Sequence, residues 1–151
     1  MAVNSGTVAA ADEATATQYN NARKDAITRV VYWPIHDKDT ALVIVDGAGQ
    51  TFDVPAWLDG WVISAVAAIV KTVSSSGLPS FQLYNLTDTV DILSTNITID
   101  ANETHSKDAT TAAVIDAAHD DLAYGDVIRC DIDAIGTGTK GLTIQMTVIG
   151  Y

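Results

Sequence analysis

Carboxylates are the side chains of this chain with the greatest scope for chemistry. Of the 19 acidic residues only Glu13 and Glu103 are glutamates, so the acidity belongs mainly to aspartates, which favour turns and loops. Carboxylate oxygens suit Ca²⁺, but no segment has the spacing or the central glycine of an EF-hand loop. The close aspartate pairs are Asp37 and Asp39, Asp120 and Asp121, and Asp131 and Asp133.

Two of these aspartates share a strand-like segment. Asp131 and Asp133 lie two residues apart, so both are expected on one face of the strand. We expect that face to be solvated, with a structural cation held between subunits as the alternative. Hydrolysis of glycosides would require one acid in an apolar pocket. Because Glu13 lies in the N-terminal segment and Glu103 in a polar loop, we expect no catalytic carboxylate pair.

The other chemically active side chains have no supporting motif. His36, His105 and His119 stand apart, and the chain has neither an HxH nor an HExxH pattern for a metal. Sequence patterns for a nucleophilic serine or a phosphate-binding loop are also absent. Cys130 alternates with isoleucines, which indicates a buried small side chain, with a catalytic thiol as the alternative. We therefore predict no enzyme, no metal site and no cofactor.

Aromatic residues offer a different chemistry, the stacking of sugar rings on exposed faces. Trp57 and Trp61 flank the start of a strand in the segment WLDGW, and Tyr124 follows later in the chain. We take Trp57, Trp61 and Tyr124 as candidate glycan contacts. Packing in the core or contact between subunits is the alternative interpretation of the same side chains.

The overall composition limits the partners. The formal charge is −11, from 8 basic and 19 acidic residues, and 48% of the residues are apolar. Binding of nucleic acid or of an anionic membrane surface is not expected, because both require clustered basic side chains. The N-terminus lacks the basic start and apolar core of a secretory signal, and the longest apolar run, about residues 60–70, is too short to span a bilayer.

The N-terminal segment has a helical pattern. After an extended arm of about 12 residues, apolar side chains recur at helical spacing, which predicts a helix from about Thr15 to Thr28, capped by Asp12 or Thr15. The stripe is narrow and rich in alanine, so the helix needs a surface to dock on, either its own domain or a partner. The residues predicted to contact a partner are Tyr19, Ala22, Arg23, Ile27 and Trp33.

The rest of the chain has the pattern of a β protein. Residues 29–40 are expected to form an extended connector, since Pro34 blocks a continuing helix. Asp46-Gly47 is a turn signal, and residues 61–73 are apolar on both faces, as in a central strand. The expected strands are residues 42–45, 51–54, 61–73, 81–86, 90–93, 96–100, 110–115, 127–133 and 142–148, with 90–93 and 96–100 either separate or parts of one long bent strand.

About eight strands without intervening helices predict a mainly β fold, an antiparallel β-sandwich of jelly-roll type with a short N-terminal helix and an extended arm. The expected division is an N-terminal region of residues 1–40, with arm, helix and connector, and a β domain of residues 41–151.

Several segments of the chain together resemble a small β-sandwich module of tailed-phage virion proteins. The resemblance rests on STNITIDANE (94–103), on DDLAYGDVIRCDID (120–133), and on a Gly/Thr turn followed by GLTIQ (141–145). The upstream run GWVISAVAAIVKTV (60–73) matches the preceding central strand of the module, and TATQYNNARKDAI (15–27) is similar to openings of head-attached and fibre-like phage proteins. About two-thirds of the chain is covered.

The resemblance implies a structural role and no catalysis. We expect a capsid decoration or head-fibre subunit on the particle surface, made in the host cytoplasm and docked through the N-terminal arm on the major capsid protein or another virion protein. Family analogy favours a homotrimer. The alternative is a tail-fibre module that binds a receptor or carbohydrate, and an aromatic cluster at the outer end, away from the arm, would favour it. An enzyme is the third possibility.

Overall fold

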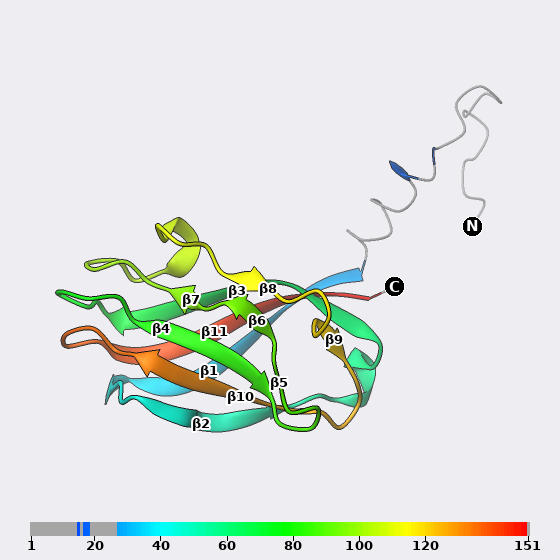
Figure 1. Ribbon diagram of the computed structural model, residues 1–151, viewed down its shortest axis with the longest axis horizontal. Coiled ribbons are helices and arrows are strands. Elements are labelled where there is room, and N and C mark those ends of the chain that lie inside the picture. Colours follow the sequence, from blue (N-terminus) through cyan, green and yellow to red (C-terminus); the bar gives the residue numbers. More distant parts are fainter. Residues whose placement is uncertain (1–14, 16, 19–26, 151) are drawn as a thin grey trace, which may run out of the picture.

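The computed structural model describes residues 15, 17, 18 and 27–150. Within them the chain is mainly β, and its two largest antiparallel sheets face each other, an arrangement consistent with the predicted β-sandwich (Figure 1). Sheet 1 has the order β1 (Thr28–Ala41), β11 (Lys140–Ile149), β3 (Trp61–Thr72) and β9 (Asp121–Leu122). Sheet 2 has the order β2 (Val45–Asp53), β10 (Val127–Ala134), β4 (Ser80–Asn85) and β5 (Val90–Asp91), and β7 (Ile97–Thr98) also pairs with β4.

The remaining elements are short. A third sheet consists of β6 (Leu93–Thr95) and β8 (Val114–Ile115). Among the described residues, 3-10 helices are formed by η1 (Ala56–Leu58), before β3, and η2 (Ser106–Asp108), in the loop after β7. This loop covers part of the free edge of β3, because the N–H of Val70 donates to the carbonyl of Thr104 and the N–H of Ala68 to the hydroxyl of Ser106.

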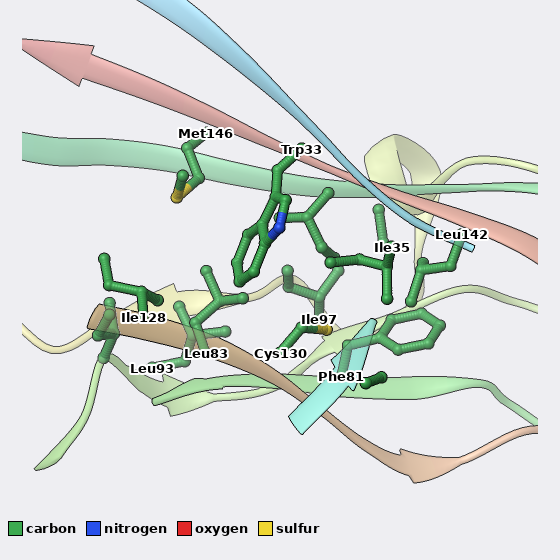
Figure 2. Close-up of a cluster of buried hydrophobic side chains, with 14 of the residues drawn as sticks. Trp33, Ile35, Phe81, Leu83, Leu93, Ile97, Ile128, Cys130, Leu142 and Met146 are labelled. Atoms are coloured by element: carbon green, nitrogen blue, oxygen red, sulfur yellow. The ribbon is translucent and has the colours of Figure 1, made fainter. Parts of the chain in front are cut away.

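The core lies between the two sheets and follows from strand alternation. In β11 the side chains of Ile144, Met146 and Val148 are fully buried, while the residues between them lie on the outer face. Figure 2 shows Trp33 and Met146 of sheet 1 pointing toward Leu83 and Ile128 of sheet 2. The two inner faces therefore form one continuous apolar layer.

Four of the predicted strands are confirmed with small changes at their ends. They are β3, β4, β10 and β11, each of which was predicted within about two residues of its bounds. β3 lies between β11 and β9, as expected for a segment that is apolar on both faces. The segments predicted at residues 90–93, 96–100 and 110–115 form only the short strands β5 to β8.

The predicted connector at residues 29–40 is wrong, because this segment is the 14-residue strand β1. β1 pairs with β11 from Thr28 onward and buries Trp33 and Ile35 in the core. It lies at the edge of sheet 1, where a strand tolerates Pro34 because one side of its backbone needs no partner. In the described residues the β structure therefore begins well before residue 41.

The start of β2 also differs from the prediction. Val43 and Ile44 lie in an exposed loop, and β2 runs through Asp46-Gly47, where a turn was expected. Gly47 has φ +77° and Gly49 has φ +66°, and the register between β2 and β10 shifts twice along this stretch. The glycines thus mark irregularities within a strand rather than its end.

The predicted helix from Thr15 to Thr28 lies largely outside the described residues. At its start, the N–H of Gln18 donates to the Thr15 hydroxyl over 3.1 Å, and the N–H of Thr15 donates to the Gln18 side-chain oxygen over 2.7 Å. This reciprocal pair is a capping box, the arrangement that begins a helix. At the other end β1 already begins at Thr28.

Gly49 gives a direct stability test of the contact between β1 and β2. A Cβ atom at this position would lie 2.5 Å from the carbonyl oxygen of Ile35, whereas a Cβ at Gly60 would meet nothing within 4 Å. Both glycines have positive φ, which costs an alanine roughly 1–2 kcal/mol. We expect Gly49→Ala to lower the free energy of unfolding by about 3 kcal/mol or more, because the backbone clash adds to this cost. Equal losses for Gly49→Ala and Gly60→Ala in urea unfolding would contradict the contact.

Candidate functional site

The three candidate glycan residues come together at one end of the β domain. Pro55 leads into η1, which places Trp57 on the surface with 56% of its area exposed. Gly60, at φ +76°, then turns the chain so that Trp61 begins β3. The rings of Trp57 and Trp61 meet edge to face, with centroids 5.7 Å apart and planes at 84°, a favoured geometry for an aromatic pair.

Strand β9 brings Tyr124 to the same place. The backbone N–H of Gly60 donates to the carbonyl of Leu122, which lies opposite Trp61 in the sheet. The N–H of Tyr124 donates to the Asp59 carboxylate over 2.9 Å. The Tyr124 side chain is 69% exposed. We call Trp57, Trp61 and Tyr124 the aromatic end of the domain.

A buried carboxylate holds the turn that carries Tyr124. Asp126 accepts hydrogen bonds from the Asn85 side chain and from the N–H of Ala123, and its own N–H donates back to the Ala123 carbonyl. The exposed fraction of Asp126 is only 5%. The sequence analysis did not single out this residue, although its place directly after Tyr124-Gly125 is the pattern of an aspartate in a turn.

The aromatic end is also where the N-terminal segment joins the domain. The pairing places Thr28 beside Ile149 and Ile149 beside Val62, so β1 begins next to the start of β3. Gly150 packs on the indole of Trp61, since a Cβ on Gly150 would lie 2.7 Å from that ring. In Figure 1 the start of β1, the C-terminus and β9 lie together at the right. The cluster is therefore not at the end away from the arm, which was the arrangement expected of a glycan-binding tip.

The structure describes two of the five residues predicted to contact a partner. Tyr19, Ala22 and Arg23 lie outside the described residues. Ile27 is half-buried, and its carbonyl accepts a hydrogen bond from the N–H of Gly150. Trp33 is only 5% exposed, donates its indole N–H to the Gln50 carbonyl and packs near Phe52, so it belongs to the core. The partner contacts themselves stay predictions.

The pair Asp131 and Asp133 is bound by the protein's own donors. Asp131 is 6% exposed and accepts from the N–H of Gly47 and from the guanidinium of Arg129, so the expectation of a solvated face is wrong here. Asp133 accepts from the side-chain amide of Asn96 over 2.6 Å. Each of the two carboxylates therefore has a donor of its own within the described residues.

Histidine and acidic side chains form no metal centre in the part of the chain that the structure describes. His36 lies in β1, and His105 accepts from the N–H of Lys107 at the start of η2. His119 lies 3.3 Å from the Asp116 carboxylate, three residues away. The three histidines thus belong to separate local arrangements.

Cys130 is fully buried in the core, as predicted. Burial raises the pKa of its thiol from 9.0 to about 12, with smaller contributions from the negative charges of Asp131 and Asp133. Because the thiolate is the nucleophilic form, this cysteine is unreactive near neutral pH. The alternative of a catalytic thiol at Cys130 has no support in this environment.

The raised pKa predicts how stability depends on pH. Between the thiol pKa of the unfolded chain and that of the folded chain, the unfolded state releases a proton that the folded state keeps. The free energy of unfolding contributed by this group is therefore lost as pH rises above about 9, by at most about 1.4 kcal/mol per pH unit. In denaturant titrations from pH 8 to 11, the stability advantage of the wild type over Cys130→Ala should shrink, and a constant difference would contradict the assignment.

Comparisons with protein-family models, with curated proteins and with solved structures find no match to this chain. Among the described residues no helix has the length and apolar character needed to cross a membrane.

Proposed function

We propose that this chain is a non-enzymatic structural subunit of a tailed-phage particle, a capsid decoration or head-fibre protein that docks by its aromatic end and N-terminal segment. The observation that carries the proposal is the exposure of Trp57 and Tyr124 beside the point where the N-terminal segment enters the domain. Tryptophan and tyrosine are the residue types most enriched at the centres of protein interfaces. Solvent-exposed rings at this position support a docking surface.

The strand order supports the finer fold assignment that belongs to this proposal, a jelly roll. Strands β1 to β4 alternate between the sheets, as do β9 to β11, and the path β1-β11-β3-β9 faces β2-β10-β4-β5, to which β7 adds a fifth strand beside β4. Jelly rolls have eight strands in two facing sheets and include viral capsid domains. A fold alone does not define a function, so the assignment to a virion rests on the sequence segments that resemble phage proteins together with the aromatic end.

The proposed partners are the major capsid protein, or another virion protein, and further copies of this chain. The proposed location is the surface of the particle, after synthesis in the host cytoplasm. A symmetric oligomer is proposed, for which the family resemblance favours a homotrimer. The net charge of −11 favours solubility of the protein before it docks.

The alternative function, a receptor- or carbohydrate-binding module, rests on the same exposed rings. Trp57 and Tyr124 offer faces on which a sugar could stack. Their place beside the start of β1 favours the docking function, because a domain tethered by its N-terminal segment would hold this end near the shell.

The test of the proposal is the composition of purified particles of the phage that encodes the chain. Quantitative mass spectrometry is expected to find this protein at a fixed copy number relative to the major capsid protein, and gel filtration is expected to show an oligomer. A monomeric protein that is absent from particles and binds glycans on an array would contradict docking and favour the alternative.

A further inference from the structure

The outer face of sheet 1 contains a broad region without charge. Side chains on this face alternate with the core residues along three neighbouring strands. They are Val30, Tyr32 and Pro34 of β1, Thr143, Gln145, Thr147 and Ile149 of β11, and Val62, Ala65, Ala67 and Ile69 of β3. Val30 is 46% exposed and Tyr32 is 64% exposed. We call these eleven residues the uncharged face.

The opposite sheet shows that this distribution is specific to sheet 1. The outer face of sheet 2 carries Arg129, Asp131 and Asp133 from β10, with Asp91 beside Tyr84 at its edge. In a chain with 27 charged residues, formed by 8 basic and 19 acidic ones, charge is plentiful on one outer face and absent from the middle of the other. The buried core of a protein interface is likewise depleted of charged residues.

Charges of opposite sign border the two ends of the uncharged face. At one end Lys71 lies over β11, because a Cβ on Gly141 would sit 2.9 Å from its Cγ. At the other end Asp121 stands beside Val62, and Asp120 precedes it. Among the described residues, neither Lys71 nor Asp121 is in an ion pair.

Other charged side chains also lie near these two ends. Lys38 and Lys140 lie close to Gly141, and the acids at this end are Asp37 and Asp39, which flank Lys38 in β1, and Glu103, which precedes the Thr104 that pairs with Val70. Lys107 and Asp108 neutralise each other in η2, at the edge of β3. Arg29 lies in β1 on the opposite side of the strand from Val30. Lys71, which follows Ile69 in the alternation of β3, and Asp121, opposite Val62, are therefore the charges that border the uncharged face on β3 and β9.

We propose that two copies of this chain pair through their uncharged faces, with Lys71 of each copy opposite the partner's Asp121. A two-fold axis between the faces and perpendicular to the strands reverses the strand direction of the second copy. Lys71 of each copy then lies opposite Asp121 of the other, so one surface supplies both halves of the contact. Small side chains in the middle allow two sheets to approach to about 10 Å, the usual distance for packed sheets.

The charge pattern selects a second copy as the occupant. Because the face has Lys71 at one end and Asp121 at the other, a second copy in the two-fold arrangement places each of them opposite a charge of the other sign, and this match also suppresses wrong partners. The inference rests on the part of the proposed function in which copies of this chain associate, but it assigns them a two-fold pair rather than the homotrimer that the family resemblance favours. That surface is distinct from the aromatic end, so one copy can pair and dock at the same time.

The test is a charge exchange between two exposed positions. Lys71→Glu gives a face with acids at both ends, and Asp121→Lys gives a face with bases at both ends. In sedimentation-equilibrium experiments at low salt, each variant alone is expected to self-associate at least about tenfold more weakly than the wild type. An equimolar mixture of the two variants is expected to regain dimers, because every contact then joins opposite charges. Asp91→Lys, on the outer face of sheet 2, is the matched control and should pair like the wild type.

The recovery in the mixture also shows that both variants are folded. A wild-type protein that is monomeric, single variants that associate like the wild type, or a mixture that does not recover would each overturn the pairing. The particle composition is measured separately by mass spectrometry. If the protein is found in particles but the charge exchange does not change its self-association, only this interface is refuted. If the protein pairs as expected but is absent from particles, only the virion role is refuted.

Discussion

Replacing Arg129 by methionine is expected to lower the free energy of unfolding by about 3 kcal/mol. The Arg129 guanidinium places Nε 2.8 Å from one carboxylate oxygen of Asp131 and Nη2 3.0 Å from the other, and it stacks 4.5 Å above the ring of Tyr84. Without arginine, a nearly buried carboxylate would lose its charge partner, which costs far more than the loss of an exposed ion pair. Urea unfolding followed by circular dichroism measures this loss.

Two further variants separate the charge effect from the loss of packing. Lys38→Met removes the cation of an exposed pair with Asp39 and should change the stability by no more than about 0.5 kcal/mol. Arg129→Met combined with Asp131→Asn should recover a large part of the loss, because the neutral amide oxygen can still accept from the N–H of Gly47. A double variant as unstable as Arg129→Met alone would show that the buried charge is not the cause.

Removing both exposed rings of the aromatic end should weaken attachment to the particle by about 100-fold or more. Each of Trp57 and Tyr124 exposes over half of its area, and centrally placed residues of these types often contribute 2 kcal/mol or more to an interface. The double variant Trp57→Ala with Tyr124→Ala should keep the fold, since its main loss is the edge-to-face contact with Trp61, worth about 1 kcal/mol. Binding of purified variants to particles that lack the protein is measured by co-sedimentation.

The control for this prediction lies at the far end of the domain. Val43 and Ile44 are each 63% exposed in the loop between β1 and β2, so their replacement by serine removes a similar kind of exposed apolar surface. The Val43→Ser and Ile44→Ser double variant should bind particles like the wild type. Loss of binding in this variant, with full binding by the aromatic-end variant, would reverse the proposed orientation.

Strong alternation made much of the fold predictable from sequence. In β10 and β11, β-branched or apolar residues at every second position indicate both the strand and its buried face, and the structure confirms both. The long apolar run of β3 likewise indicated an interior strand. These segments are predictable because the same residues specify the local conformation and the burial.

The strand β1 was missed because a local rule was given too much weight. Pro34 was taken to mark a connector, although Val31, Trp33 and Ile35 alternate in the manner of a strand that is buried on one face. Proline is compatible with an edge strand, but whether a strand lies at an edge depends on contacts with β11 that are more than 100 residues away. The same limit applies to Asp46-Gly47, where pairing with β10 extends a strand through a turn signal.

The sequence indicated which residues could form a site, but it did not indicate where they lie in the fold. Trp57 and Trp61 were close in sequence, but the approach of Tyr124 depends on β9 and on the buried carboxylate of Asp126. The end of the domain at which they meet depends on the pairing of β1, β11 and β3, which no local pattern shows. Burial of Asp131 was also missed, since alternation predicts which face a residue occupies but not what covers it.

The central claim, docking by the aromatic end, is tested most directly by electron cryo-microscopy of purified particles. We expect density for the β domain on the particle surface, with Trp57 and Tyr124 against the shell and the loop of Val43 and Ile44 pointing outward. Particles without this density, or a domain attached by the Val43 and Ile44 loop with its aromatic end in solvent, would contradict the claim.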